Sequence, residues 1–263
     1  MKAMIFAAGM GTRLKPITDT IPKALVPVCS QPLLKHLIDK LKDAGYTSVV
    51  INVHHFAEKI REYVAQNNNF GIEISFSDES DLLRETGGGI KHAAALLNDG
   101  EPFLVHNVDI LSNLNLEAFY EAHLAESISI DTPLATILVS ERETARYFLF
   151  DAQNNLVGWM NKLSGEVKSP YGELRREPSE NFDWEKFLKE NSLKKYAFAG
   201  THIMSSEIFR LMEDWPERFP IVDFYLKVAD KYIIKGYVKN DLEMVDVGKL
   251  DSLEQAEKFL LCR

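Results

Sequence analysis

The most constraining stretch lies at the start of the chain, where an apolar run breaks into a proline-rich loop. Residues 2–8 (KAMIFAA) form a nearly continuous apolar run, which is typical of a strand buried on both faces of a parallel sheet. Residues 9–30 contain Pro16, Pro22 and Pro27, and this density of proline excludes a helix and predicts a long, ordered loop. We read the rest of the chain as the scaffold and the partners of this loop.

Strand-like and helix-like segments alternate as far as residue 139. Such alternation indicates βαβ units with parallel strands. The predicted fold class is therefore α/β, with a three-layer, mixed but mainly parallel sheet between helices. The strands are expected at residues 48–53, 72–76, 102–105 and 134–139, and the helices begin at Pro32 and at residues 56, 90 and 116.

The pattern changes after residue 140, although the length of 263 residues fits a single domain spanning 1–263. Between residues 161 and 195 the sequence predicts only a short helix at 184–189. The other expected elements are a hairpin (147–150 with 156–160), a strand (196–204), a serine-capped helix (205–212), a helix (221–229), a pair of strands (232–238 with 242–245) and a closing helix (250–261).

The charge balance limits the possible partners. The chain has 30 Lys and Arg against 39 Asp and Glu, a formal net charge of −9, which argues against nucleic acid or a membrane surface as its partner. The loop is a local exception, because residues 10–28 contain Arg13, Lys15 and Lys23 against only Asp19. From charge alone, a solvated loop and an anion site remain equally open.

The two cysteines and the apolar runs bear on the compartment. Cys29 and Cys262 are far apart without metal-ligand spacing, as expected of free thiols in a reducing cytosol. We find no signal peptide at the start and no run of 18 apolar residues. The sequence thus predicts a soluble cytoplasmic protein, and leaves open whether it forms a homo-oligomer.

The glycine pair after the first strand admits three phosphate-binding interpretations. Leu14 stands where a dinucleotide fingerprint needs its third glycine, and the prolines prevent the helix that this fingerprint requires. A Walker loop is excluded because no Gly-Lys-Ser/Thr follows. What remains is a nest of backbone N–H groups beside Thr12, Arg13 and Lys23, which suits a polyphosphate.

Two aspartates stand at positions where α/β sheets bind ligands. Asp109 follows a predicted strand, and Asp246 lies in a Val-Asp-Val-Gly segment far along the chain. Carboxylates of this kind commonly hold Mg²⁺ together with substrate phosphates. Each one alone is more readily explained as a cap of the following helix or turn.

The loop as a whole resembles a known signature. It reads Gly9-x-Gly11-Thr12-Arg13-Leu14-x-Pro16-x-Thr18 followed by Pro22-Lys23-x-Leu25-x-Pro27-Val28. This pattern is similar to that of the sugar-1-phosphate nucleotidyltransferases, which convert a nucleoside triphosphate and a sugar 1-phosphate to a nucleotide sugar and pyrophosphate. The resemblance implies their Rossmann-like nucleotide-diphospho-sugar transferase fold.

The resemblance also implies roles for individual residues. Arg13 would hold the departing phosphates, Lys23 would neutralise the α-phosphate and the sugar phosphate, and Asp109 and Asp246 would bind Mg²⁺; these four would be catalytic. Residues 1–130 would bind the nucleotide, and residues 131–263 would supply the sugar site and the second metal ligand. The implied nucleotide contacts in the loop are Ala8, Gly9, Met10, Gly11, Thr12, Arg13 and Lys23, and the implied sugar-phosphate contacts are Lys23, Asp109 and Gly200.

A second glycine-rich segment bears on the base. Glu85-Thr86-Gly87-Gly88-Gly89 precedes a helix, and glycines there would let a ligand approach the backbone closely; a flexible turn is the alternative. This segment is similar in sequence to that of N-acetylmuramate-1-phosphate uridylyltransferases. The resemblance implies that Asn107 of this chain would also contact the nucleotide. The implied substrates are UTP and N-acetylmuramate 1-phosphate, used in cell-wall sugar recycling.

Two other functions stay open. One is the same chemistry with another pair of substrates, as in mannose- or heptose-1-phosphate guanylyltransferases. The other is a regulatory subunit that binds nucleotide sugars without turnover. Val108 and Lys249 stand where many members of the family have Gly and Thr, and these departures leave room for such a non-catalytic protein.

Overall fold

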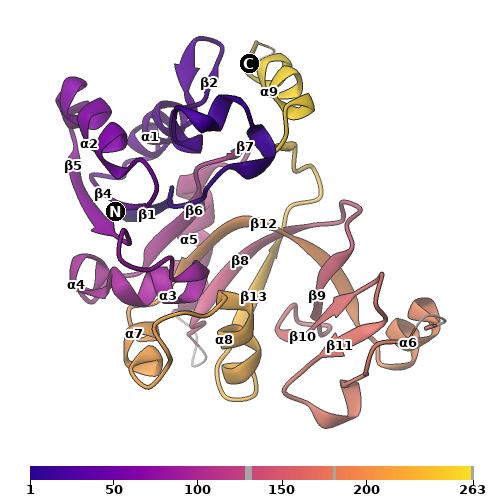
Figure 1. The fold of residues 1–263 in the computed structure, drawn as a ribbon. Coiled ribbons are helices and arrows are strands. Elements are labelled where there is room, and N and C mark those ends of the chain that lie inside the picture. The colour runs from indigo at the N-terminus through magenta and orange to yellow at the C-terminus, as the bar shows by residue number, and fades with distance from the viewer. Residues whose placement is uncertain (128–131, 180–181, 262–263) are drawn as a thin grey trace.

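A large mixed sheet forms the centre of the computed structural model, which describes residues 1–127, 132–179 and 182–261 (Figure 1). Its strand order is β11-β10-β9-β12-β6-β1-β4-β5, with β8 paired to β12 and β13. The strands of this sheet are β1 (Lys2–Phe6), β4 (Ser48–Val53), β5 (Glu73–Asp78), β6 (Phe103–Asn107), β8 (Ala135–Ser140), β9 (Arg146–Phe150), β10 (Leu156–Asn161), β11 (Glu166–Lys168), β12 (Lys194–Met204) and β13 (Ile234–Val238).

Helices cover both faces of this sheet. The α-helices are α1 (Leu33–Asp43), α2 (Ala57–Gln66), α3 (Glu85–His92), α4 (Ala94–Leu97), α5 (Leu116–Ser127), α6 (Trp184–Glu190), α7 (Ile208–Met212), α8 (Ile221–Val228) and α9 (Asp251–Leu261). Short 3-10 turns are η1 (Thr12–Leu14), η2 (Ile17–Asp19), η3 (Lys23–Leu25), η4 (Asn68–Gly71) and η5 (Gly172–Leu174). Two small ribbons pair β2 (Pro27–Val28) with β3 (Gln31–Pro32), and β7 (Ile110–Ser112) with β14 (Met244–Asp246).

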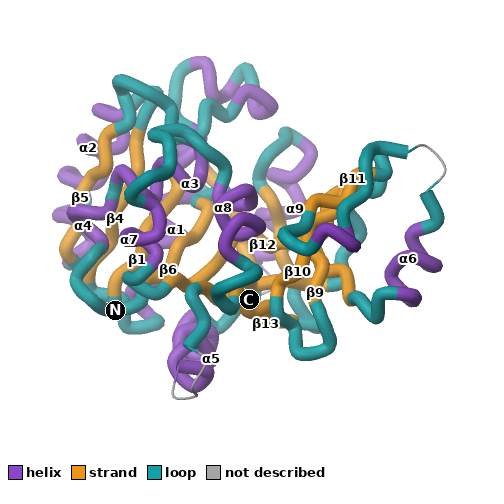
Figure 2. The backbone as a smooth tube through the Cα atoms, turned by 90° about the horizontal axis from the view of Figure 1, so that it is seen from below, coloured by secondary structure: helices purple, strands orange, loops and turns teal. Residues whose placement is uncertain are grey.

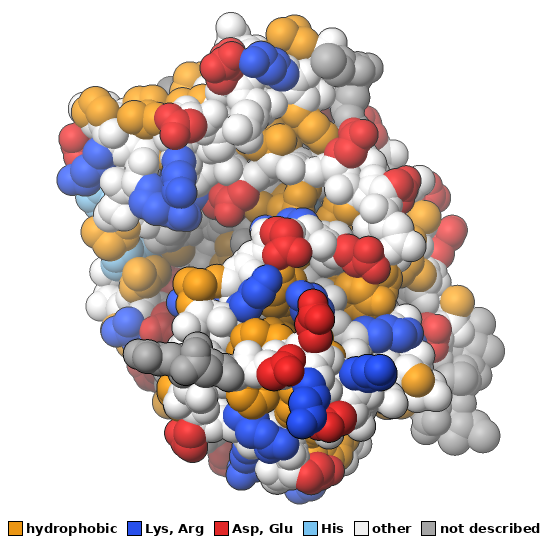
Figure 3. Space-filling view, turned by 90° about the vertical axis from the view of Figure 1, so that its right-hand side faces the viewer, with side chains coloured by type: hydrophobic (Ala, Val, Ile, Leu, Met, Phe, Trp, Pro, Cys, Tyr) orange, Lys and Arg blue, Asp and Glu red, His pale blue; other side chains and the backbone are white. Residues whose placement is uncertain are grey.

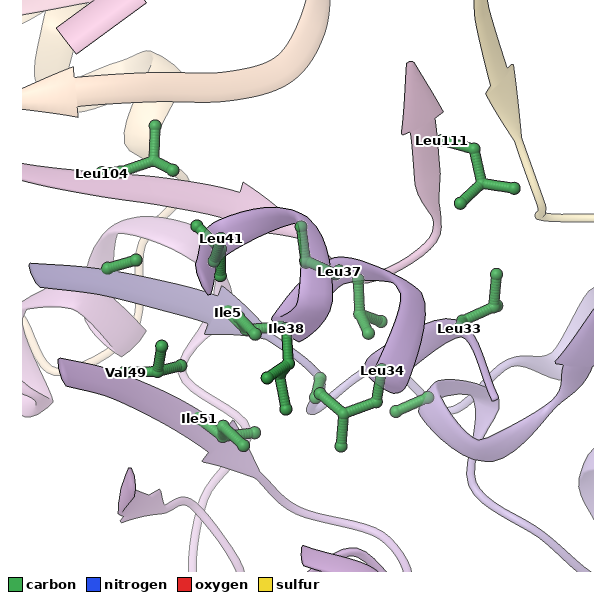
Figure 4. Close-up of a cluster of buried hydrophobic side chains, with 14 of the residues drawn as sticks. Ile5, Leu33, Leu34, Leu37, Ile38, Leu41, Val49, Ile51, Leu104 and Leu111 are labelled. Atoms are coloured by element: carbon green, nitrogen blue, oxygen red, sulfur yellow. The ribbon is translucent and has the colours of Figure 1, made fainter. Parts of the chain in front are cut away.

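The apolar run of β1 is buried because alternate side chains enter two different cores. Ile5 belongs to the core under α1, whereas Met4 belongs to the core under α3, α7 and α8. The five apolar residues of α1 recur at helical spacing and are all buried, and among them Leu34 and Ile38 lie toward Ile5 and Ile51 on β1 and β4 (Figure 4). β1 pairs in parallel with both β4 and β6, as predicted for a strand buried on both faces.

A lobe built from β9, β10, β11 and α6 projects from one end of the sheet (Figures 1 and 2). It has its own small core, in which Leu149, Met160 and Phe187 are buried. On the face of the molecule that this lobe presents, basic and acidic side chains are interspersed (Figure 3).

The last helix returns to the beginning of the chain. α9 lies beside β2 in the ribbon view (Figure 1), and Cys29 Sγ lies 3.8 Å from the carbonyl oxygen of Glu257. Cys29 is a free thiol, whereas Cys262 lies outside the described residues. None of the described helices is long and apolar enough to cross a membrane.

The predicted fold class is confirmed, with β1, β4, β5 and β6 parallel. Two local predictions were wrong. The segments at 232–238 and 242–245 do not pair with each other, because β13 joins β8 and β14 joins β7. α7 begins without a serine cap, since its N-cap residue is Glu207 and no side chain caps it. The prediction for 161–195 also missed β11 and η5.

Candidate active site

A cavity of about 570 Å³ opens at the carboxyl ends of β1, β4, β5 and β6. This edge of a parallel sheet is where open α/β folds bind their ligands. Most of the residues predicted from the sequence line it, namely Ala8, Gly9, Met10, Gly11, Thr12, Arg13, Lys23, Glu85, Thr86, Asn107 and Asp109.

The glycine loop is held open by contacts that only glycine permits at position 11. Gly11 has φ +62°, and a Cβ there would lie 2.9 Å from the Thr18 side chain. The Thr18 hydroxyl donates to the Gly11 carbonyl at 2.8 Å, and the N–H of Leu14 donates to the same oxygen at 2.9 Å. Leu14 is fully buried and anchors the loop, so that Arg13 lies on the cavity wall.

Lys23 and Asp109 form an ion pair on the cavity wall. The Lys23 ammonium donates to Oδ2 of Asp109, and the two side chains are only 11% and 20% exposed. Asp109 comes from the turn after β6, and Lys23 comes from η3. The loop therefore places Lys23 beside the aspartate that follows β6.

Strand pairing brings Asp246 to the same place from the far end of the chain. β14 pairs with β7 so that Asp246 is opposite Ile110, and the Val247 N–H donates to the Asp109 carbonyl at 2.8 Å. A Cβ on Gly248 would lie 2.8 Å from Asp246 Oδ1 and 2.9 Å from a terminal nitrogen of Arg13. The carboxylate and the guanidinium therefore converge over Gly248.

The charges in this cluster influence one another. Partial withdrawal from water, and next the negative charge of Asp109, raise the pKa of Asp246 above its ordinary value, while Lys23 and Arg13 act in the opposite direction. Two carboxylates this close repel each other unless a cation lies between them or beside them. Lys23 and Arg13 supply positive charge beside them.

The donor set also fits a hard divalent cation. Asp109 and Asp246 offer carboxylate oxygens, which are the ligands that Mg²⁺ prefers. Among the described residues no group of three or more His, Cys, Asp or Glu side chains is placed to bind a metal. A cation here would thus take its other ligands from water and from substrate phosphates, the usual arrangement for Mg²⁺.

Gly87 and Gly88 do not line the cavity, and the interpretation that they expose backbone to a ligand needs correction. Both N–H groups donate to the carbonyl of Phe219, at 2.9 and 3.1 Å. A Cβ at Gly87 would lie 2.3 Å from the Phe219 ring, and one at Gly88 would lie 2.1 Å from the Glu217 carbonyl. These glycines are needed for close packing of α3 against the loop before α8.

Gly200 is likewise occupied by a protein contact. It has φ +71°, and a Cβ there would lie 2.8 Å from the Asn107 side-chain nitrogen. Gly200 thus supports Asn107 from behind, while Asn107 lines the cavity. A contact between Gly200 and a sugar stays a prediction.

Several cavity residues were not predicted from the sequence. The segment before α8 reaches the site because Arg218 pairs with Glu85 at 2.9 Å and the Ile221 N–H donates to the Thr86 hydroxyl at 2.9 Å. A polar residue at the end of a buried strand was the available signal for Asn52. The lining residues that were not predicted, Asn52 included, are Phe6, Ala7, Asn52, Glu79, Leu83, Val108, Pro220 and Gly248.

Comparisons with known proteins agree with the resemblance found in the loop. The chain is 41% identical over 131 residues to the N-acetylmuramate alpha-1-phosphate uridylyltransferase of Neisseria meningitidis serogroup B, covering 49% of this chain and 56% of that protein. It is 36% identical over 160 residues to the mannose-1-phosphate guanylyltransferase catalytic subunit beta of Danio rerio, covering 57% and 44%. The chain thus spans about half the length of these curated relatives.

A solved structure shows the same fold. A UDP-glucose pyrophosphorylase complexed with UDP-glucose superposes with a TM-score of 0.73 at 18% identity, covering 100% of this chain and 99% of that one. The model of the nucleotidyl transferase family matches residues 2–263. The homologues and structural neighbours are sugar-1-phosphate nucleotidyltransferases, and the chain itself belongs to the nucleotidyl transferase family.

Proposed function

We propose that the protein is an enzyme that transfers a nucleotidyl group from a nucleoside triphosphate to a sugar 1-phosphate. The single observation that carries this proposal is the cluster of two cations, Arg13 and Lys23, with two carboxylates, Asp109 and Asp246, of which Arg13, Lys23 and Asp109 line the cavity and Asp246 lies next to it beside Gly248. Such a cluster suits the neutralisation and alignment of phosphates. Membership of the nucleotidyl transferase family supports the same reaction.

In the proposed reaction an oxygen of the sugar phosphate attacks the α-phosphorus in line. A new bond forms between this oxygen and the α-phosphorus, and the bond from the α-phosphorus to the β-phosphate oxygen breaks. Pyrophosphate leaves with the bonding electrons, so that no covalent intermediate with the enzyme is needed. The products are the nucleotide sugar and pyrophosphate.

Each charged residue has one role in this scheme. Arg13, on the glycine loop, binds the leaving β and γ phosphates through its forked N–H groups. Lys23 exchanges its pairing with Asp109 for contacts with the α-phosphate and the sugar phosphate. Asp109 and Asp246 would hold Mg²⁺, which would neutralise charge on the reacting phosphates.

For the substrates we propose UTP and N-acetylmuramate 1-phosphate. The form of the Glu85–Gly89 segment and the 41% identity to the meningococcal uridylyltransferase support this pair. Glu85, Thr86 and Asn107 are the proposed nucleotide contacts beyond the loop. Residues 131–263 are proposed to bind the sugar, and the reaction is proposed to occur in the cytoplasm, where nucleoside triphosphates are available.

A guanylyltransferase acting on mannose 1-phosphate is the second candidate. The observation that favours it is the 36% identity to the zebrafish subunit over a longer stretch, 160 residues. Competition among UTP, GTP, dTTP and CTP for product formation distinguishes the two. Preference for GTP would replace the first candidate by the second.

Release of pyrophosphate tests the class of reaction. Purified protein with Mg²⁺ is assayed against a panel of nucleoside triphosphates and sugar 1-phosphates, and at least one pairing should release pyrophosphate. Arg13→Gln should remove this activity. Lys15→Gln is the matched control, because Lys15 lies in the same loop but is 60% exposed and pairs only with Asp19 among the described residues. Thermal stabilisation by nucleotide without pyrophosphate release would instead favour the regulatory subunit.

A further inference from the structure

Glu79 is a fully buried carboxylate on the cavity wall. It lies just beyond the end of β5, at the other side of the cavity from Lys23 and Asp109, beside the start of α3. A carboxylate taken out of water needs hydrogen-bond donors to offset the loss of its hydration. The groups that donate hydrogen bonds to Glu79 link it to three segments of the cavity wall: β4, the end of β1 and the start of α3.

The first connection runs to β4 and from there to β1. The side-chain amide of Asn52 donates to Oε1 of Glu79 at 2.8 Å. The amide oxygen of Asn52 in turn accepts from the N–H groups of Ala7 and Ala8, at 2.7 and 3.2 Å. Both the nitrogen and the oxygen of the Asn52 amide are therefore hydrogen-bonded, and Asn52 fixes the backbone that leads into the glycine loop.

The second connection runs to the start of α3. The other carboxylate oxygen of Glu79 accepts from the N–H of Arg84 at 2.9 Å, directly before Glu85 and Thr86 on the cavity wall. Gly89 makes room for this arrangement, because a Cβ there would lie 2.8 Å from Oε1 of Glu79. The lack of a side chain at Gly89 therefore leaves room for the buried carboxylate of Glu79.

We infer that Glu79 is a positioning residue for the nucleotide. Through Asn52 it sets the backbone where β1 ends and the glycine loop begins. Through Arg84 it sets the first turn of α3 on the opposite wall. The inference rests on the proposed function only in taking this cavity as the nucleotide site.

The pattern of donors and acceptors allows a test in which the amide and the carboxylate are exchanged between positions 52 and 79. Both neighbours of Glu79 donate, so Glu79→Gln places an NH₂ group against a donor at one of its two contacts. Asn52→Asp keeps the acceptor for Ala7 and Ala8 but sets a second carboxylate against Glu79. In the double variant the new amide at position 79 can donate to the new carboxylate at position 52 and still accept from Arg84.

Nucleotide affinity is the readout, measured calorimetrically with UTP, GTP, dTTP and CTP and without sugar phosphate. For the nucleotide that the wild-type protein binds most tightly, each single variant should raise the Kd about 10- to 100-fold, and the double variant should restore it to within about threefold. In turnover the single variants should raise KM for this nucleotide and leave KM for the sugar phosphate unchanged. A purely structural role would lower the amount of folded protein without this selectivity.

Ser77→Ala is the matched control. Ser77 is buried on β5, two residues before Glu79, and within the described part of the chain its hydroxyl has no hydrogen-bond partner. This variant should bind nucleotide as the wild-type protein does. If the single variants do not fold, a folded double variant that binds nucleotide within threefold of wild type supports the inference, and one that fails to bind overturns it.

The results separate this inference from the proposed reaction. Single variants that bind nucleotide as tightly as wild type overturn the positioning role even if pyrophosphate is released. If the single variants bind nucleotide more weakly, the double variant restores binding, and the wild-type protein releases no pyrophosphate, the positioning role is supported. The proposed reaction is then contradicted. Failure of the wild-type protein to bind any of the four nucleotides overturns both.

Discussion

Three buried histidines should make the protein lose stability between pH 7 and pH 5. His106 on β6, His123 on α5 and His202 on β12 are at most 2% exposed. Burial lowers the pKa of His106 and of His123 to about 4, and burial together with the nearby His106 lowers the pKa of His202 to about 3. All three are therefore neutral in the folded protein at pH 5.

The sign and size of the effect follow from proton linkage. In the unfolded chain the same histidines titrate near 6.5, so below that pH the unfolded state binds protons that the folded state cannot accept. A folded pKa of about 4 then costs about 2 kcal/mol per histidine at pH 5 relative to pH 7. The three together cost about 6 kcal/mol, a large part of the 5–15 kcal/mol typical of a domain.

Urea unfolding followed by tryptophan fluorescence at pH 7 and pH 5 measures this loss. The variant His202→Gln keeps a polar group near Tyr225, whose hydroxyl lies 2.7 Å from Nδ1 of His202, and it should reduce the pH-dependent loss by about 2 kcal/mol. His55→Gln at an exposed position should leave it unchanged. A free energy of unfolding that differs by less than about 1 kcal/mol between the two pH values would refute the reasoning.

Three further predictions concern the cavity and its supports. Lys23→Met should lower kcat about 10²- to 10³-fold in steady-state assays, and near-normal turnover would exclude its contact with the reacting phosphates. Asp109→Asn should lower the pKa of Asp246 in a carboxyl NMR titration, because the charge of Asp109 raises it; an unchanged pKa would place the two groups apart. Gly88→Ala should cost about 1–3 kcal/mol in urea unfolding, since its Cβ would lie 2.1 Å from a backbone carbonyl. Gly172→Ala, with no atom within 4 Å of its Cβ, should change stability by less than about 0.5 kcal/mol.

Local pattern was enough to predict the strands of the large sheet and the main helices in the first half, but not the short strands β2, β3 and β7. The run at residues 2–8 and the segment at 48–53 are buried on both faces, so their apolar content is visible without knowledge of their neighbours. The prolines of the glycine loop fixed its irregular path in the same way. Strand partners that are far apart in the sequence were harder to predict, and the partner of β14 is the clearest case. Its partner β7 lies more than 130 residues earlier, and nothing in the local sequence of either strand specifies that register.

The residues of the candidate site also differ in whether the local sequence is enough to predict them. Arg13, Lys23 and Asp109 follow directly from a loop and a strand end that are recognisable in sequence. Asp246 was noted in the sequence, but its role as a metal ligand came only from the family resemblance, and its place beside Asp109 depends on β14 joining β7. The roles of Gly87 and Gly88 could not be predicted, because glycine has the same appearance in sequence whether a ligand or Phe219 approaches it.

Transfer of the α-phosphate label tests the central claim most directly. The protein is incubated with Mg²⁺, N-acetylmuramate 1-phosphate and UTP carrying ³²P at the α position, and the products are separated by chromatography. We expect the label to appear in a uridine diphosphate sugar, to depend on both substrates, and to be lost in the Asp109→Asn variant. If the label stays in UTP or appears only as UMP, and no other pairing of nucleotide and sugar phosphate gives a labelled nucleotide sugar, the proposal that this cavity catalyses nucleotidyl transfer is contradicted.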